Sequence, residues 1–239
     1  MRADTPPIVL VHGAWHGAWC FAALQAELDR RGIPTYAIDL PGHGASTSPL
    51  GDLHGDAAYV ADVLRSLGRP AVLVGHSYGG AVIAEAAALT SGILHLAYLA
   101  AFALHAGESI TSLLRSLQRA PVALSAAIEA LDDGTSVLVG DQRIAEALYA
   151  KCAPTTIAAA LPRLGPQPAI TFGQAISAAP RDPVASTYVR CTQDQAIHIS
   201  HQDHMADRCT TVHTFETDHS PFLSMTAEVA DILETIARG

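Results

Sequence analysis

A serine stands between two glycines in the stretch VLVGHSYGG at residues 72–80, as Gly75, Ser77 and Gly79. The stretch begins with a short apolar run and leads into a helical one. G-x-S-x-G between a strand and a helix is typical of a nucleophile elbow, a sharp turn that holds the serine hydroxyl clear of the backbone. The glycines let the strand and the helix approach closely. A bare G-x-S-x-G also occurs in ordinary turns, but this context favours Ser77 as the nucleophile of an acyl transfer.

A serine nucleophile needs a base, and the base needs a third group that orients it. His219 follows the last expected strand, in the stretch FETDHSPFL, so a loop can bring its ring over Ser77. The acid is expected between these two residues in the chain, at the end of another strand. Asp194 in TYVRCTQDQAI meets that condition. Asp218 is a rival, but it adjoins His219 and we expect its side chain to point elsewhere.

The sequence HGAW occurs twice in succession from residue 12 onward. Histidines four apart bind a metal when both lie on one helix face. Acyl transfer instead requires two N–H donors for an oxyanion, one from the residue after the nucleophile, Tyr78, and one from a loop with a His-Gly pair. We therefore expect His12 and Gly13 to shape this loop and the N–H of Ala14 to be the second donor. His16 is then expected to open the following helix, so the two histidines do not share a helix face.

A second histidine cluster, HISHQDHMADRC, covers residues 198–209. His201 and His204 are three apart and could share a helix face, but no cysteine or glutamate completes a metal-ligand pattern. An exposed polar helix face is the favoured interpretation. We predict that the protein uses neither a metal ion nor a cofactor.

Short apolar runs alternate with longer amphipathic stretches along most of the chain. Apolar strands separated by helices indicate a parallel sheet that is covered on both faces. The expected strands are residues 8–11, 35–39, 71–74, 93–102, 187–191 and 211–216. The expected helices are residues 17–32, 57–68, 79–90, 196–207 and 227–237.

Residues 103–185 break this alternation, because they are rich in alanine, leucine and proline and helical in character. An insertion between strands of a parallel sheet commonly lies over the carboxyl ends of the strands, where ligands bind. We therefore expect an α/β core formed by residues 1–102 and 186–239. Residues 103–185 are expected to form a helical lid.

The composition limits the class of partner. The chain has 239 residues, of which 49% are hydrophobic and 15% charged, so it can form a substantial core. The net charge is −9 and no basic run occurs, so neither nucleic acid nor a membrane is an expected partner. The N-terminal MRADTPP lacks the apolar core of a signal peptide. Four scattered cysteines without a C-x-x-C pair indicate free thiols, and we expect a cytoplasmic protein.

These residues together resemble the α/β-hydrolase superfamily. More narrowly, the chain is similar to a small-lidded branch that holds bacterial carboxylesterases, plant methyl esterases, salicylate-binding esterases and hydroxynitrile lyases. The matching pieces are VLVHGAWHGAW, DLPGHG, GHSYGG, CTQDQAI and DHSPFLS. The resemblance implies an α/β-hydrolase fold with a mostly parallel sheet and helices on both faces. It also implies a triad of Ser77, Asp194 and His219, with the N–H groups of Ala14 and Tyr78 as the oxyanion hole.

Two positions separate hydrolysis from lyase chemistry within this resemblance. The cyanohydrin-cleaving lyases carry threonine at the position of Gly13 and lysine directly after the triad histidine, where this chain has Ser220. A lyase needs a positive group to stabilise the departing cyanide, and Ser220 does not supply one. Hydrolysis is therefore favoured. Ser77 also argues against the dehalogenase relatives, which use an aspartate nucleophile.

The sequence thus predicts a serine hydrolase that cleaves a small, largely hydrophobic carboxylic ester, or a related carbonyl substrate, through an acyl-enzyme. C–C bond, lactone or cyclisation chemistry on a specialised metabolite would use the same triad. A ligand-binding receptor with weak turnover would retain the same shape. The fold alone does not decide between them. A homodimer stays an alternative to the monomer.

Overall fold

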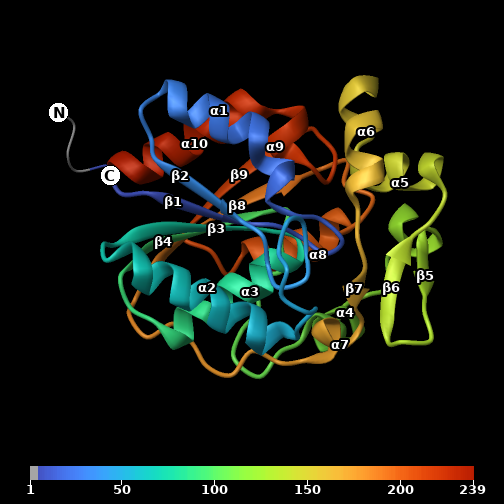
Figure 1. Cartoon of the computed structure of the whole chain (residues 1–239), viewed down its shortest axis with the longest axis horizontal. Coiled ribbons are helices and arrows are strands. Elements are labelled where there is room, and N and C mark those ends of the chain that lie inside the picture. The colour runs from blue at the N-terminus through green and yellow to red at the C-terminus, as the bar shows by residue number, and fades with distance from the viewer. Residues whose placement is uncertain (1–4) are drawn as a thin grey trace.

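A six-stranded sheet with the order β2-β1-β3-β4-β8-β9 forms the centre of the molecule, and every neighbouring pair is parallel. The computed structural model describes residues 5–239, so part of the MRADTPP stretch lies outside the described residues (Figure 1). All six expected strands are present, and the parallel α/β architecture is confirmed. The strands are β1 (Ile8–Val11), β2 (Thr35–Ile38), β3 (Ala71–His76), β4 (Ile93–Leu99), β8 (Ala185–Cys191) and β9 (Thr211–Phe215).

Helices cover both faces of the sheet, as the continuous apolar strands predict. In β1, Val9 and Val11 pack into the core on the side of α2 and α3, whereas Ile8 and Leu10 pack on the side of α1 and α10. Figure 1 shows these two helical layers on opposite sides of the sheet. The helices of the core are η1 (Ala18–Phe21), α1 (Ala22–Arg30), α2 (Leu53–Leu67), α3 (Tyr78–Leu89), α8 (Ile199–Ala206), α9 (Pro221–Ser224) and α10 (Thr226–Arg238).

Several element boundaries differ from the sequence prediction, and two of the differences have identifiable reasons. Helix α2 begins four residues before the expected residue 57, because the carboxylate of Asp52 accepts a hydrogen bond of 2.8 Å from the N–H of Gly55 and caps the helix. The expected helix 17–32 begins as a 3₁₀ turn. Strand β4 ends at Leu99 and not at residue 102, because Ala100 adopts a left-handed backbone with φ of 43°.

The lid is not wholly helical, so that prediction was wrong. It contains a three-stranded antiparallel sheet with the order β5-β6-β7. Strands β5 and β6 are joined by a tight turn in which Gly134 has a φ of 82°. An Asp-Gly pair flanked by short apolar runs is a hairpin signal, so this element was detectable in the sequence. The lid elements are α4 (Ile110–Ser116), η2 (Ala123–Ala126), β5 (Ile128–Ala130), β6 (Thr135–Leu138), α5 (Asp141–Leu148), α6 (Pro154–Ala160), η3 (Leu161–Arg163), β7 (Gln167–Pro168) and α7 (Ile170–Gly173).

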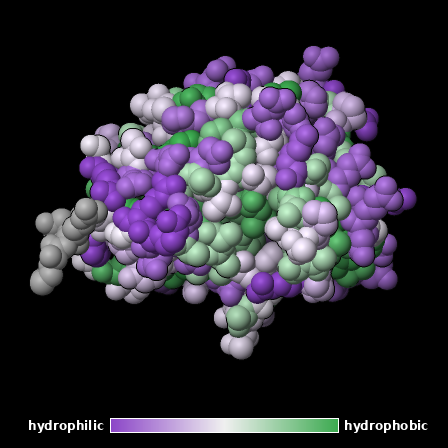
Figure 2. All heavy atoms as spheres, turned by 90° about the horizontal axis from the view of Figure 1, so that it is seen from above, coloured by the Kyte–Doolittle hydropathy of each residue, from purple (hydrophilic) through white to green (hydrophobic). Residues whose placement is uncertain are grey.

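The outer face of α1 and α10 carries many charged groups. Arg31, directly after α1, forms ion pairs with Asp231 and Glu234 of α10. Figure 2 shows that hydrophilic residues cover much of the face seen there, with hydrophobic patches between them. Within residues 5–239, no helix has the length and hydropathy that a membrane crossing requires.

Candidate active site

Ser77 lies in a strained turn between β3 and α3. Its backbone has φ of 52° and ψ of −119°, a conformation that non-glycine residues rarely adopt. The two flanking glycines permit this turn. A Cβ atom at Gly75 would lie 2.5 Å from the carbonyl oxygen of Gly79, and a Cβ atom at Gly79 would lie 2.5 Å from the carbonyl oxygen of Val11. Helix α3 therefore starts directly against β1 and β3, and the Ser77 side chain is presented at the carboxyl ends of these strands.

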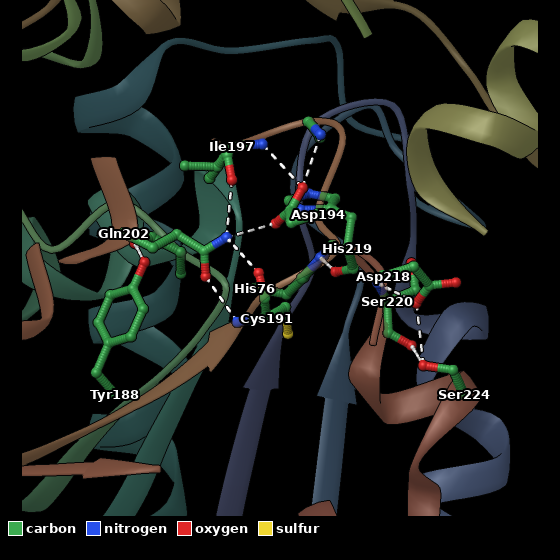
Figure 3. Close-up of polar contacts among 12 residues, drawn as sticks. His76, Tyr188, Cys191, Asp194, Ile197, Gln202, Asp218, His219, Ser220 and Ser224 are labelled. Carbon is green, nitrogen blue, oxygen red and sulfur yellow. Dashed lines mark hydrogen bonds and ion pairs between the residues drawn. The ribbon is translucent and has the colours of Figure 1, made fainter. Parts of the chain in front are cut away.

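His219 and Asp194 form a buried hydrogen-bonded pair. The distance from Nδ1 of His219 to Oδ2 of Asp194 is 2.7 Å, and both side chains are almost fully buried (Figure 3). The other carboxylate oxygen, Oδ1, accepts from the N–H groups of Ala196 at 2.7 Å and Ile197 at 2.9 Å. These donors compensate a buried negative charge. The pair fixes the imidazole orientation, with Nδ1 facing the carboxylate and Nε2 on the opposite side of the ring.

Gln202 completes the environment of Asp194, and sequence reasoning missed it. Its Nε2 donates to Oδ2 of Asp194 at 3.0 Å and to the carbonyl oxygen of Ile197 at 2.7 Å (Figure 3). Its Oε1 accepts from the N–H of Cys191 at 2.9 Å, and the side chain is fully buried. A lone glutamine in a short helix carries no sequence signal for this role, because the role depends on how α8 packs against the end of β8.

Asp218 points away from the imidazole of His219, as expected. Its Oδ2 accepts a hydrogen bond of 2.7 Å from the N–H of Lys151 in the lid. Its Oδ1 accepts from the N–H of Ser220 at 3.1 Å and from the hydroxyl of Ser224 at 3.0 Å (Figure 3). Asp218 therefore holds the turn before α9 and a lid loop together.

His76 connects the serine turn to the His219 loop. Its Nε2 donates to the carbonyl oxygen of His219 at 2.9 Å, and the two ring centroids are 4.6 Å apart. Within residues 5–239, the buried Nδ1 of His76 has no hydrogen-bond partner. A Cβ atom at Gly13 would lie 2.9 Å from this Nδ1 and 2.9 Å from Cβ of Ser77. The residue directly before Ser77 thus positions His219, and the absence of a side chain at Gly13 keeps this place open.

The loop after β1 holds its peptide groups in fixed orientations. The carbonyl oxygen of Gly13 accepts from Nδ1 of His12 at 2.8 Å and from the N–H of His16 at 3.3 Å. In a trans peptide the following N–H points to the opposite side, so the N–H of Ala14 faces away from these two groups. Ala14 and Ser77 line the same cavity. That the Ala14 N–H serves as an oxyanion donor stays a prediction.

The two histidines of the HGAW repeat are neutral structural residues. Nε2 of His12 accepts from the N–H of Leu40 at 3.1 Å. His16 donates from Nδ1 to the carbonyl oxygen of Ala14 at 2.8 Å, and its Nε2 bonds the hydroxyl of Tyr149 in the lid at 2.6 Å. Burial lowers the pKa of His12 to about 3 and the pKa of His16 to about 4. Both rings are occupied by hydrogen bonds, which argues against the metal interpretation of this repeat.

Tyr78 contributes its backbone to the site and its side chain to the core. It is the first residue of α3, so its N–H has no carbonyl partner one turn earlier in the helix. Its hydroxyl donates to Oδ2 of Asp56 at 2.7 Å. Burial raises the pKa of Asp56 to about 7. The side chain of Tyr78 therefore anchors the start of α3 to α2, away from Ser77.

The lid is bonded to the loop after β1 through Trp15. This residue has a left-handed φ of 64°. Its carbonyl oxygen accepts from the N–H of Gly165 at 2.9 Å, and its Nε1 donates to the carbonyl oxygen of Ser136 at 3.2 Å. Its N–H lies 3.4 Å from Oε1 of Gln167, which also bonds Nε2 of His43 at 3.0 Å. Sequence reasoning missed Gln167, because nothing near it in the chain indicates that it reaches the loop.

A cavity of about 230 Å³ opens beside Ser77 between the core and the lid. Its polar side chains are few, and its apolar lining comes from both the core and the lid. The apolar residues are Ala14, Trp15, Phe102, Ile110, Leu114, Val122, Leu124, Ile128, Phe172, Ala196 and Ile197. The cavity can accept a small apolar ligand whose polar group faces Ser77.

The second histidine cluster does not form a ligand set. Nε2 of His201 donates to the carbonyl oxygen of Gln118 at 2.9 Å, and His204 contacts Arg208. Among residues 5–239, no group of three or more histidine, cysteine, aspartate or glutamate side chains is placed to hold a metal ion. That the protein works without a metal or cofactor stays a prediction.

Comparison with known proteins agrees with the fold. The sequence model of the family described as "Alpha/beta hydrolase family" matches residues 8–232, which is most of the chain. The chain belongs to the alpha/beta hydrolase family.

Two relatives and one solved structure illustrate the range of similar proteins. The alpha/beta hydrolase nvfD of Aspergillus novofumigatus is 28% identical over 204 residues, which cover 80% of this chain and 79% of that protein. A carbendazim hydrolyzing esterase of Nocardioides is 37% identical over 111 residues, which cover 44% of this chain and 46% of the esterase. The crystal structure of a methylesterase from Arabidopsis superposes with a TM-score of 0.81 at 24% identity, covering 96% of this chain and 98% of that one.

The neutral buried histidines of this alpha/beta hydrolase make its stability depend on pH. In the unfolded chain a histidine has a pKa near 6.5, whereas folding lowers that of His16 to about 4. Below about pH 6.5 the unfolded state binds a proton that the folded state does not. The free energy of unfolding therefore decreases as the pH is lowered from about 6.5 to about 4. Each such histidine contributes a slope of up to about 1.4 kcal/mol per pH unit.

We predict that His16→Gln gives a shallower decrease in stability over this pH range than the wild type. Urea unfolding at several pH values measures the slope. His105→Gln is the matched control, because His105 is exposed. Equal slopes for the wild type and His16→Gln would show that His16 is not buried in its neutral form.

Proposed function

We propose that this alpha/beta hydrolase is a serine carboxylesterase that cleaves a small, largely hydrophobic ester through an acyl-enzyme. The observation that carries the proposal is the buried pair of Asp194 and His219 together with the bond from His76, the residue before the strained Ser77, to the His219 carbonyl. Ser77 itself lines an apolar cavity. Membership of a hydrolase family and a relative named as an esterase support a carboxylesterase-type hydrolase.

The first half of the reaction uses the geometry around Ser77. The Ser77 hydroxyl attacks the ester carbonyl carbon while Nε2 of His219 accepts its proton. Asp194 keeps the proton of His219 on Nδ1 and stabilises the imidazolium that forms. The N–H groups of Ala14 and Tyr78 bind the oxyanion, a charge that is largest in the transition state and the tetrahedral intermediate. His219 then passes its proton to the departing alkoxide.

The second half returns the enzyme to its starting state. Water attacks the acyl group on Ser77, and His219 accepts a proton from that water and gives it back to the serine. No additional charged group is needed for either half. A cyanohydrin lyase needs a cation after the triad histidine, and here that position is Ser220, a buried serine. At the position of the lyase threonine, a Cβ atom at Gly13 would lie 2.9 Å from Cβ of Ser77.

The experiment that tests this function is a screen of the purified protein against short acyl aryl esters, methyl esters, lactones and mandelonitrile. We expect turnover of an aryl acetate or butyrate and no cyanide release above background. Ser77→Ala should lower kcat by on the order of 10⁴ or more while the protein stays folded. A fluorophosphonate probe should label Ser77 in the wild type, as read by peptide mass spectrometry.

Three outcomes would contradict the proposal. Cyanide release that depends on Ser77, without ester turnover, would indicate a lyase. Product analysis that finds C–C bond cleavage, lactone chemistry or a cyclisation, without ester hydrolysis, would indicate a different carbonyl chemistry. Binding of an apolar ligand without any turnover would indicate a receptor.

The acid of the triad is tested by a pair of neighbouring substitutions. Asp194→Asn should lower kcat by on the order of 10⁴, because the amide favours the wrong tautomer of His219. Asp218→Asn should have a much smaller effect on kcat, because Asp218 bonds Lys151 and Ser220 and not the imidazole. Steady-state kinetics on an aryl acetate, with circular dichroism to check folding, measure both. A larger loss in Asp218→Asn would refute the assignment.

The hydrogen bonds between the lid and the loop after β1 are tested through Gln167. Gln167→Met removes the acceptor of the Trp15 N–H and the partner of His43 while keeping a similar volume. A displaced Ala14 N–H weakens transition-state binding more than substrate binding, so kcat should fall by about 10-fold or more with little change in KM. Gln167→Glu keeps an acceptor and should retain more activity.

Gln174→Met is the matched control for that experiment. Gln174 is also a lid glutamine that bonds the core, accepting from the N–H of Leu53 at 2.8 Å and donating to Asp52 at 3.0 Å, but at the start of α2. We expect any loss of stability in the two methionine variants to be similar and the loss of kcat to be confined to Gln167→Met. Equal kcat in both variants would show that the lid does not position the loop.

A further inference from the structure

A second compartment of about 170 Å³ adjoins the cavity beside Ser77. Ser77 lines only the first compartment, so the second extends away from the nucleophile. Together they form one elongated cavity between the core and the lid. The residues that line both compartments are Phe102, Leu114, Val122, Ser125, Ala196 and Ile197.

The charge of this elongated cavity is opposite to that of the whole protein. The chain has 23 acidic and 14 strongly basic residues. Yet no aspartate or glutamate lines either compartment, and the ionisable side chains that do are Arg119, His198 and His201. All three line the second compartment and none lines the first. The lining beside Ser77 is thus apolar, and the basic residues are confined to the second compartment.

The basic groups keep hydrogen-bonding capacity for a ligand. Within residues 5–239, the guanidinium of Arg119 makes no hydrogen bond and no ion pair. His201 uses Nε2 to bond Gln118, and His198 uses Nδ1 to bond Ser200, so each ring has a second nitrogen outside these contacts. A guanidinium presents paired donors that match the two oxygens of a carboxylate.

The acidic groups on the segments that carry lining residues are already engaged. Asp203 on α8 forms an ion pair with Arg190 on β8. Asp194 is buried against His219, with each of its oxygens bonded. Glu108 pairs with Arg208. These contacts leave Arg119 without a competing carboxylate among the residues that line the compartment.

We propose that the second compartment binds a carboxylate at the end of the substrate remote from the scissile ester. This inference rests on the proposed esterase function and narrows it. The substrate class is an ester with an apolar middle segment, which lies against the shared lining, and a terminal carboxylate that pairs with Arg119. A monoester of a medium-length dicarboxylic acid has this pattern, and so does an acyl ester of a hydroxy acid.

The experiment compares anionic esters with their neutral counterparts. Mono-4-nitrophenyl adipate and suberate carry the carboxylate on the acyl side, and 4-acetoxyphenylpropanoate carries it on the leaving-group side. Each is paired with its methyl-capped form. We expect the wild type to favour the carboxylate form in at least one of the two series, measured as the ratio of kcat/KM values, and we expect added salt to reduce this ratio.

Arg119→Gln should lower that ratio about fivefold, mainly through KM, as expected for an ion pair of an exposed arginine. Arg115→Gln is the matched control, because Arg115 is an exposed arginine of α4 that lines neither compartment. It should leave the ratio unchanged. No preference for the carboxylate in the wild type, or equal ratios in the two variants, would overturn the proposal.

Failure of this inference is distinguishable from failure of the esterase function. If the capped esters are hydrolysed with dependence on Ser77 but the carboxylate gives no advantage, the esterase function stands and the carboxylate site is wrong. If no ester is hydrolysed, titration calorimetry of the folded protein with monomethyl suberate still tests the compartment. Binding that weakens in Arg119→Gln and not in Arg115→Gln would support it, and the absence of binding would refute it.

Discussion

The left-handed backbone at Ser77 is the constraint on which the rest of the site depends. A non-glycine residue in such a conformation costs about 1–3 kcal/mol, so the surrounding structure has to hold it. The carbonyl oxygen of Ser77 accepts hydrogen bonds from the N–H groups of Gly80 at 3.0 Å and Phe102 at 3.1 Å, which join the turn to α3 and to the end of β4. The place of β3 in the middle of the sheet thus brings the loops that follow β1, β8 and β9 around one side chain.

The buried polar groups of this site are of two kinds: one carboxylate surrounded by hydrogen-bond donors, and several neutral histidines that connect loops. The carboxylate of Asp194 accepts four hydrogen bonds, from two backbone amides, Gln202 and His219. The histidines at 12, 16 and 76 instead bond backbone groups of the loops around Ser77. Neutral imidazoles suit this task, because one nitrogen can donate while the other can accept, as both do in His12 and His16, and burial keeps the rings uncharged. The repeated HGAW thus has a structural basis: each ring fixes one peptide group of the loop that carries the Ala14 N–H.

The core of the fold and the candidate triad could be predicted from the sequence, but the residues that support the triad could not. Continuous apolar runs identified strands such as β1 and β3, which are buried along their whole length. The edge strands β2 and β9 are more polar and more exposed, and the alternation of strands and helices along the chain placed them. Ser77, Asp194 and His219 each follow a strand, so their convergence at the carboxyl end of the sheet could be predicted. Gln167 and Gln202 could not, because their contacts depend on packing between distant segments. The lid hairpin at Gly134 had a local signal that the alanine-rich composition around it obscured.

The lid contacts both the cavity beside Ser77 and the loop after β1. Its small sheet contributes Ile128 of β5 to the cavity wall, while β6 and β7 supply Ser136 and Gln167, which bond Trp15. Because these strands are hydrogen-bonded to one another, we expect a change in the cavity wall to displace the residues that hold the loop after β1. A flap that merely covered the site would influence KM alone. Under the proposed esterase function, a lid bonded to the loop after β1 is expected to affect kcat as well, so that an ester that fits the cavity poorly is also hydrolysed slowly once bound.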